Sequence, residues 1–163
     1  MKNQSVLIGA GLVLALTFAT TAVAQQHCSG PQIGTWKLKS YVQFDMKTGQ
    51  RTAVFGAHPT GYITYGSDCR MQAIIVAEGR KAPPTIVLTD TDRIGLYKGF
   101  IAYAGAYSIN GDVVSHHIDA SWNETWTGTN QKRAFKIDGK TLGIKTIGLI
   151  SPVTGKEVVS ELV

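Results

Sequence analysis

The sequence predicts an all-β fold, a single antiparallel β-barrel of about eight strands with one short helix. Residues 34–44 form a long run in which apolar and polar side chains alternate, which is typical of a strand with one buried face. Eight or nine short β-forming runs follow one another at regular spacing, with turn residues between them. Neither a strand–helix alternation nor the cysteine and tryptophan spacing of immunoglobulin domains is present, so a barrel is favoured over a parallel sheet or a sandwich.

The opening strand has two faces. In steps of two, one face carries four apolar side chains and one polar side chain: Trp36, Leu38, Ser40, Val42 and Phe44. The other face carries Thr35, Lys37, Lys39, Tyr41 and Gln43. Because side chains of a strand alternate between faces, we expect the first set to line the inside of the barrel.

Turn residues then divide the first half of the chain into short elements. Gly49 supplies a positive φ in the turn at residues 45–50, and residues 66–69 form a second tight turn. A charged loop that contains proline covers residues 78–84. The predicted strands are residues 51–55, 62–65, 70–77 and a short edge strand at residues 85–88.

One short helix is predicted from about Asp92 to Lys98. The Thr and Asp side chains of residues 89–92 can accept hydrogen bonds from the free N–H groups of a helix start. Asn110-Gly111 and Asp138-Gly139 are hairpin turns, and residues 121–130 form a tryptophan-rich loop. The remaining predicted strands are residues 100–109, 112–120, 131–137, 140–147 and 157–163.

The N-terminus has the pattern of a signal peptide over residues 1–24. Lys2 precedes an apolar run, and Ala22-Val23-Ala24 has the small-x-small form of a cleavage site, so we expect cleavage after Ala24. The alternative is an uncleaved membrane anchor, but the apolar run is short for a span. Residues 25–163 then form one secreted or periplasmic domain, without a later segment that could span a membrane as a helix.

Charge is mildly basic and dispersed. The formal net charge is +5 and falls to +4 when the leader is removed, because Lys2 is its one charged residue. The basic residues form no dense patch and no aromatic-interleaved motif, which argues against nucleic-acid binding. No spacing typical of a metal site, a dinucleotide or phosphate loop, or a hydrolase nucleophile is present, so neither cofactor nor metal is predicted.

Two cysteines, Cys28 and Cys69, follow the leader. An even count in an oxidising compartment favours a disulfide, which would tie the segment before the first strand to a hairpin turn. In the chain-entropy model such a bridge is worth roughly 4 kcal/mol. Two unrelated thiols remain the alternative.

Several segments, in order along the chain, resemble the bacterial lipocalin-like domain family, a branch of the calycin-type barrels. They are GTWKLKSY from Gly34, FGAHPTGYITY from Phe55, YKGFIAYAGAY from Tyr97, VVSHHIDAS from Val113 and WTGTNQKR from Trp126. The resemblance implies an up-and-down barrel with a pocket for a small, mostly apolar molecule. It also implies a structural plug, in which Arg133 packs on Trp36 at one barrel end. Arg133 shares a strand face with Phe135 and Ile137, which would point it inward, and an ordinary surface charge is the alternative. The resemblance carries over no catalytic residue.

Candidate ligand-binding residues come from the inner faces of the predicted strands. His116 lies on the apolar face of its strand, where it could contact a ligand, act as an acid or base, or be an ordinary core histidine. His117 lies on the opposite face. The aromatic candidates for the pocket are Tyr62, Tyr103, Tyr107 and Trp126.

Three functions fit these residues. The first is a barrel that binds a small hydrophobic molecule in its interior. The second is an enzyme that isomerises or cyclises such a molecule, and the third is a structural or partner-binding barrel filled by its own side chains. The ligand and the oligomeric state are not indicated by the sequence.

Overall fold

The computed structural model describes residues 27–163, so the predicted signal peptide, residues 1–24, lies outside the described residues. The described chain forms one antiparallel sheet with two short helices, α1 (Asp90–Lys98) and the 3₁₀ helix η1 (Glu124–Trp126). The first six strands are β1 (Gly34–Lys37), β2 (Tyr41–Asp45), β3 (Arg51–Thr52), β4 (Thr60–Tyr65), β5 (Arg70–Val76) and β6 (Phe100–Asn110). The remaining five are β7 (Val113–Ser121), β8 (Asn130–Asp138), β9 (Thr141–Thr146), β10 (Leu149–Ile150) and β11 (Glu157–Leu162).

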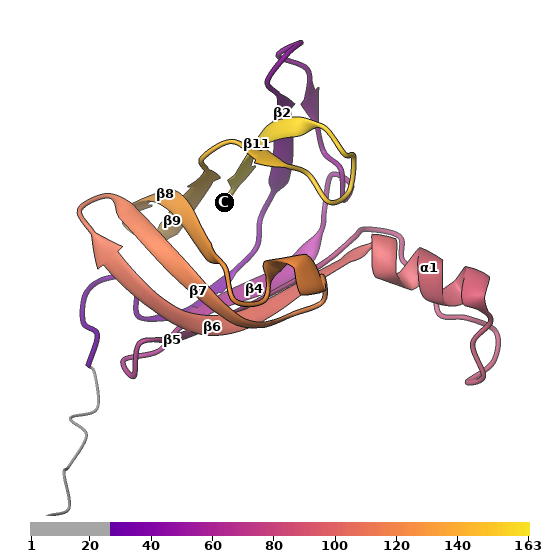
Figure 1. Cartoon of the computed structure of the whole chain (residues 1–163), viewed down its shortest axis with the longest axis horizontal. Coiled ribbons are helices and arrows are strands. Elements are labelled where there is room, and N and C mark those ends of the chain that lie inside the picture. The colour runs from indigo at the N-terminus through magenta and orange to yellow at the C-terminus, as the bar shows by residue number, and fades with distance from the viewer. Residues whose placement is uncertain (1–26) are drawn as a thin grey trace, which may run out of the picture.

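The sheet is an up-and-down meander that curls into a barrel (Figure 1). Its strand order is β1-β4-β5-β6-β7-β8-β9-β11-β2-β3, with β10 paired to β11. The all-β class, the antiparallel order and the one α-helix are as predicted. The strand count is eleven rather than about eight, because the opening strand is split into β1 and β2 and because the two-residue strand β10 was not predicted.

The opening strand changes partner, and its faces change with it. β1 pairs with β4, whereas β2 pairs with β11, and the backbone of residues 38–40 makes the change. Trp36 and Leu38 are half-buried as predicted, but after the break Tyr41 and Gln43 are the buried residues. The prediction that Val42 and Phe44 continue the inner face is therefore wrong, because an irregularity between two strand halves shifts the alternation by one residue.

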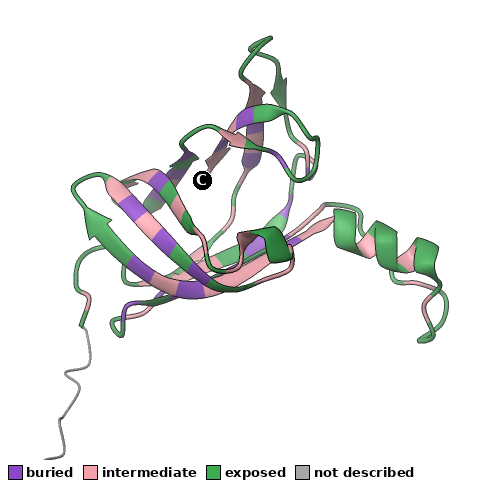
Figure 2. Cartoon of the chain, in the orientation of Figure 1, coloured by how far each residue is buried: buried purple, intermediate pink, exposed green. Residues whose placement is uncertain are grey.

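Two clusters of buried residues form the core. Figure 2 shows in purple where buried residues lie along the strands. The first cluster includes Tyr65, Met71 and Val114, and the second is centred on Tyr41 and Phe55. The first cluster also contains Cys69, which forms a disulfide with Cys28 with a Cα–Cα separation of 5.1 Å. Because the backbone N–H of Cys28 also donates to Ser67 O, the N-terminal segment is fixed to the β4–β5 turn.

Residues 78–99 project away from the barrel and carry α1 (Figure 1). The helix begins at Asp90, two residues before the predicted start, and is capped by Thr89 and Asp92 in a reciprocal capping box. The predicted edge strand at residues 85–88 is wrong, because this segment lies in the projecting arm and pairs with no strand. The predicted strand at residues 51–55 is shortened to β3. In the described part of the chain, neither helix has the length and apolar character needed to cross a membrane.

Candidate functional site

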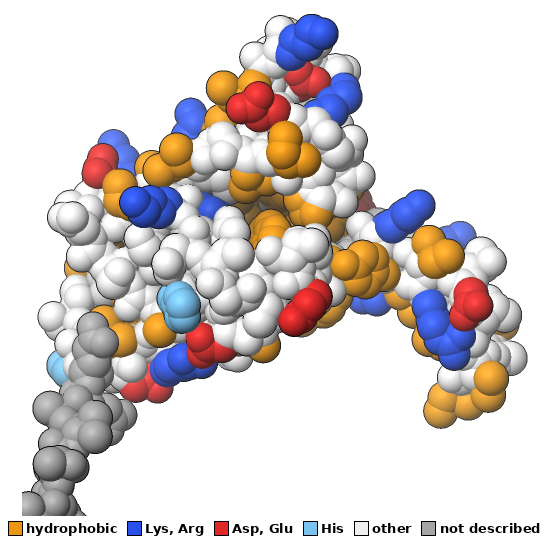
Figure 3. All heavy atoms as spheres, viewed as in Figure 1, with side chains coloured by type: hydrophobic (Ala, Val, Ile, Leu, Met, Phe, Trp, Pro, Cys, Tyr) orange, Lys and Arg blue, Asp and Glu red, His pale blue; other side chains and the backbone are white. Residues whose placement is uncertain are grey.

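A cavity of about 310 Å³ lies inside the barrel, between β1 and β9. These two strands are not neighbours in the sheet. β11 lies between β9 and β2, and it pairs with only two residues of β9. A space is therefore left beside the opening strand. The cavity is lined by residues of seven strands and by residues next to the ends of three of them: Thr35, Trp36, Lys37, Leu38, Lys39, Tyr62, Ile63, Ala73, Ile75, Tyr103, Arg133, Lys140, Thr141, Leu142, Ile144, Leu162 and Val163. Figure 3 shows apolar side chains inside a hollow on the face in view.

Most of the cavity wall is apolar, and the charged side chains that line it are all basic. Lys37, Lys39 and Lys140 are exposed, so they mark the side on which the cavity meets solvent. Arg133 differs from them, because its side chain is buried with only 5% of the residue exposed. The cavity thus has an apolar wall, a basic rim and one guanidinium inside.

Arg133 has few protein partners for a buried charge. Its Nη1 donates to the carbonyl oxygen of Lys132 at 2.9 Å, and both Nη1 and Nη2 lie 3.5 Å from Gln131 Oε1, the outer limit of a hydrogen bond. Its guanidinium lies over the Trp126 ring, 6.0 Å from the ring centroid. No carboxylate of the described residues forms an ion pair with it.

His116 is fully buried beside the cavity but is not among the residues that line it. Its Nε2 lies 2.8 Å from the Tyr65 hydroxyl, and its Nδ1 lies 3.4 Å from the Tyr103 hydroxyl. Burial, together with the nearby charge of Arg133, lowers the pKa of His116 to about 3, so the ring is neutral at ordinary pH. Both ring nitrogens are thus engaged by protein groups.

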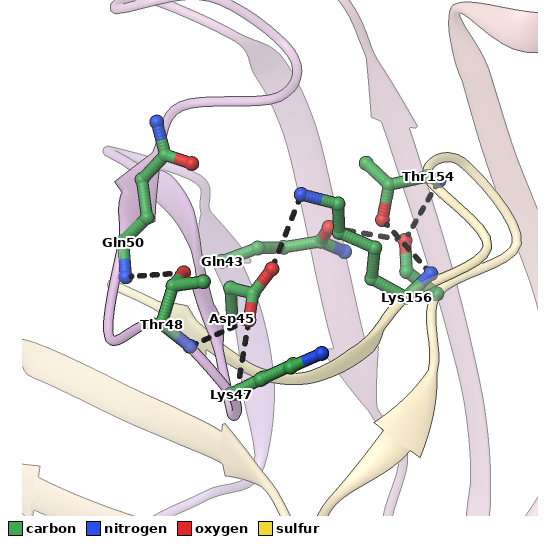
Figure 4. Close-up of polar contacts among 8 residues, drawn as sticks. Gln43, Asp45, Lys47, Thr48, Gln50, Thr154 and Lys156 are labelled. Carbon is green, nitrogen blue, oxygen red and sulfur yellow. Dashed lines mark hydrogen bonds and ion pairs between the residues drawn. The ribbon is translucent and has the colours of Figure 1, made fainter.

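A second buried polar group surrounds Gln43. Figure 4 shows Gln43 beside Asp45 and the exposed turn that contains Thr48, and beside the segment that carries Thr154 and Lys156. Gln43 Nε2 donates to the Tyr41 hydroxyl at 2.8 Å and lies 3.3 Å from Ser160 Oγ, while Gln43 Oε1 accepts from Ser151 Oγ at 3.0 Å. Ser151 Oγ also accepts from the backbone N–H groups of residues 153 and 154. We call Gln43, Tyr41, Ser151 and Ser160 the Gln43 cluster; each of these side chains has a protein partner.

The predicted pocket residues divide between cavity and core. Tyr62 and Tyr103 line the cavity, and Trp126 lines a smaller neighbouring space of about 40 Å³ together with Arg133 and Tyr103. Tyr107 is instead a core residue, 3% exposed, whose hydroxyl donates to Gly66 O. His116 does not line the cavity but contacts Tyr103, which does.

The expected plug differs in its partner. Trp36 and Arg133 both line the cavity, but the structure places the guanidinium over Trp126 and not over Trp36. Trp36 instead donates from Nε1 to Gln32 O at 2.8 Å and packs against the first core cluster. Trp126 can reach Arg133 because η1 follows β7 directly and leads into β8, the strand that carries Arg133.

Several cavity residues were not singled out from the sequence. They are the apolar wall residues Ile63, Ala73, Ile75, Leu142, Ile144 and Leu162. The alternation of residues 141–146 and 70–76 carries the signal for four of them, because it places Leu142, Ile144, Ala73 and Ile75 on inner faces. Across residues 27–163, no group of three or more His, Cys, Asp or Glu side chains is arranged to hold a metal ion.

Comparison with known proteins gives one match. A family model described as a lipocalin-like domain matches residues 33–161, which include every strand of the barrel apart from the last residue of β11, and all cavity residues except Leu162 and Val163. No curated protein matches the chain.

Proposed function

Because the chain belongs to the lipocalin-like domain family, we propose that it binds a small hydrophobic molecule inside its barrel. The cavity of about 310 Å³ between β1 and β9 supports this proposal most directly. Its size is at the lower end of the usual range for small-molecule pockets, roughly 300–1,000 Å³. An apolar ligand would gain about 25 cal/mol for each Å² of surface that it buries against this wall.

The cavity also argues against a barrel that is filled by its own side chains. In such a barrel, Leu142 and Ile144 of β9 would meet the side chains of β1 across the interior. Here these residues border the cavity together with Trp36. A ligand-binding barrel is therefore better supported than a purely structural one.

An isomerase or cyclase that uses His116 as acid or base is less well supported. His116 does not line the cavity, and both of its ring nitrogens face tyrosine hydroxyls. General acid–base chemistry needs a titrating group within hydrogen-bond reach of the substrate. Binding therefore explains the geometry with fewer requirements.

Titration with N-phenyl-1-naphthylamine, an uncharged apolar fluorophore, tests the proposal. We expect its fluorescence to rise on binding to the disulfide-bonded protein, and to rise much less with Ile144→Trp, whose larger side chain would occupy the cavity. Lys145→Trp is the matched control, because the neighbouring residue is exposed on the other face of β9. Equal titrations for wild type and Ile144→Trp would place the fluorophore elsewhere and reject the proposal.

We further propose that the protein works outside the cytoplasm, in the periplasm or medium. The leader-like residues 1–24 and the pairing of Cys28 with Cys69 support this location, since disulfides persist in oxidising compartments. Fractionation of the native host and mass determination of the mature protein test it. A mature chain that begins at Gln25 is expected.

A further inference from the structure

We propose that the ligand carries a carboxylate group and that Arg133 binds it inside the barrel. This inference rests on the proposed function, because it names the chemical class of the molecule that enters the cavity. The ligand class is then an apolar acid with a single negative charge, such as a fatty acid.

A guanidinium has five N–H donors and is always charged, so its burial is costly unless an anion pairs with it. Arg133 is 5% exposed, yet it makes one short hydrogen bond, to Lys132 O, and two contacts at 3.5 Å to Gln131. Among the described residues, each ion pair joins other groups. The protein itself therefore leaves the positive charge of Arg133 without a negative partner.

The position of Arg133 indicates where a negatively charged partner would bind. Arg133 borders the 310 Å³ cavity and also the 40 Å³ space beside Trp126, so its free donors can face a molecule in the cavity. Its planar fork of donors matches the two oxygens of a carboxylate, which can be bound bidentately. Tyr103 lines both spaces, and its hydroxyl lies near the Arg133 guanidinium, whose charge opposes the effect of burial on the pKa of Tyr103 without cancelling it. Burial raises the pKa of this hydroxyl, so it stays protonated and can donate to an anion.

The charges around the cavity fit the same ligand class. The side chains that line it include four basic groups and no Asp or Glu. Val163 also borders the cavity, but its backbone oxygen is already hydrogen-bonded to the N–H groups of Lys39 and Ser40. A negative molecule is therefore attracted at the lysine rim and again at Arg133, whereas an apolar cation meets the same charge at both places.

The apolar wall accommodates the rest of such a molecule. Apolar side chains from β4, β5, β9 and β11 line the same cavity as Arg133: Ile63, Ala73, Ile75, Leu142, Ile144 and Leu162. With the carboxylate at Arg133, a short hydrocarbon chain would lie against these residues and lose its contact with water. One end of the ligand is thus held by charge and the other by burial.

Competition between decanoate and 1-decanol tests the proposal, because the two probes share a chain and differ in the head group. Each is titrated against N-phenyl-1-naphthylamine bound to the disulfide-bonded protein. We expect decanoate to displace the fluorophore at about 30-fold lower concentration than 1-decanol, the ratio expected for a charge-assisted hydrogen-bonded pair. Equal potency would overturn the proposal.

Variants at two neighbouring positions assign the effect to Arg133. Arg133→Met should reduce the preference for decanoate to within about three-fold of 1-decanol, while 1-decanol itself binds almost unchanged. Arg133→Lys should keep part of the preference because it retains the charge. Lys132→Met is the matched control, since it removes one positive charge from the exposed face of β8 and should keep the full preference. A preference that survives Arg133→Met, or is lost in Lys132→Met, would overturn the assignment.

The outcomes separate this inference from the function on which it rests. If the fluorophore binds but decanoate fails to displace it, the acid-binding proposal is wrong and the hydrophobic pocket stands. If none of the three probes binds to the wild-type protein, the proposed function is wrong and the inference falls with it. Folding of each variant is checked by the far-ultraviolet circular dichroism of the barrel.

Discussion

The barrel interior contains two kinds of buried polar side chain, and they differ in the source of their partners. In the Gln43 cluster, two serine hydroxyls and a tyrosine hydroxyl each bind the amide of Gln43. His116 is similar, because Tyr65 and Tyr103 face its two ring nitrogens. Arg133 is as deeply buried as these groups, but it borders a cavity and has no ionic partner among the described residues.

This difference distinguishes polar groups that maintain the fold from one that is available for binding. A buried group whose hydrogen bonds are all made within the protein stabilises one arrangement of the strands, and removing it leaves its partners unsatisfied. A buried charge without a partner weakens the ligand-free fold and becomes favourable only when an anion arrives. Replacing each kind of group by an apolar residue of similar size should therefore have opposite effects on stability.

The largest effect is expected for Gln43→Leu. The change leaves the hydroxyls of Tyr41 and Ser151 without their buried partner, so the free energy of unfolding should fall by about 3 kcal/mol. Denaturant unfolding followed by circular dichroism measures this. Gln50→Leu is the matched control, because this glutamine of the same hairpin is exposed, and it should change stability by less than about 0.5 kcal/mol. Equal costs for the two variants would contradict the distinction.

Acid should unfold the protein partly through His116. Its pKa is about 3 in the folded protein against 6.5 for the free side chain, so the unfolded state binds more protons between these values. The resulting stability is complete above pH 6.5 and declines as pH falls towards 3, by about 2 kcal/mol between pH 6.5 and 4.5.

The matched pair His116→Gln and His117→Gln assigns that decline. His117 is the next residue on β7 but is exposed. Denaturation midpoints measured across this pH range should lose much of their slope in His116→Gln and keep it in His117→Gln. A slope that is identical in both variants would show that the decline comes from other groups.

Arg133→Met should change stability in the opposite direction from Gln43→Leu. Methionine fills a similar volume without a charge, so the ligand-free protein should become more stable by about 1 kcal/mol, after the loss of the contacts to Lys132 O and Trp126. Thermal unfolding of ligand-free protein measures this, with Lys132→Met as the control. A loss as large as that of Gln43→Leu would mean that Arg133 has a structural role.

The sequence predicts the barrel better than it predicts the interior. Turn residues and alternation locate β4 to β9 because none of these strands exchanges one neighbouring strand for another. The opening strand exchanges β4 for β11 at residues 38–40, so its alternation shifts at a point that depends on distant strands. The buried positions of Tyr41 and Gln43 therefore could not be derived from residues 34–44 alone.

The candidate site shows the same limit. Alternation correctly places His116 and Arg133 on inner faces, because it depends on local geometry. It cannot show that Tyr103 lies between His116 and the cavity, or that Trp126 rather than Trp36 lies under Arg133. These relations depend on the curl of the sheet and on the path of η1, which are set by contacts between elements distant in the sequence.

The smallest expected effect concerns the lysine rim, and it tests whether the rim and Arg133 have separate roles. Lys140→Glu reverses one exposed charge at the cavity edge, so the association rate of decanoate should fall about three-fold while that of 1-decanol is unchanged. Stopped-flow fluorescence measures both rates. Lys98→Glu is the control, since it makes the same change on α1, away from the cavity. Salt at 0.5 M should remove the rate difference, because exposed charges are screened within about 4 Å, whereas the preference that depends on buried Arg133 should persist.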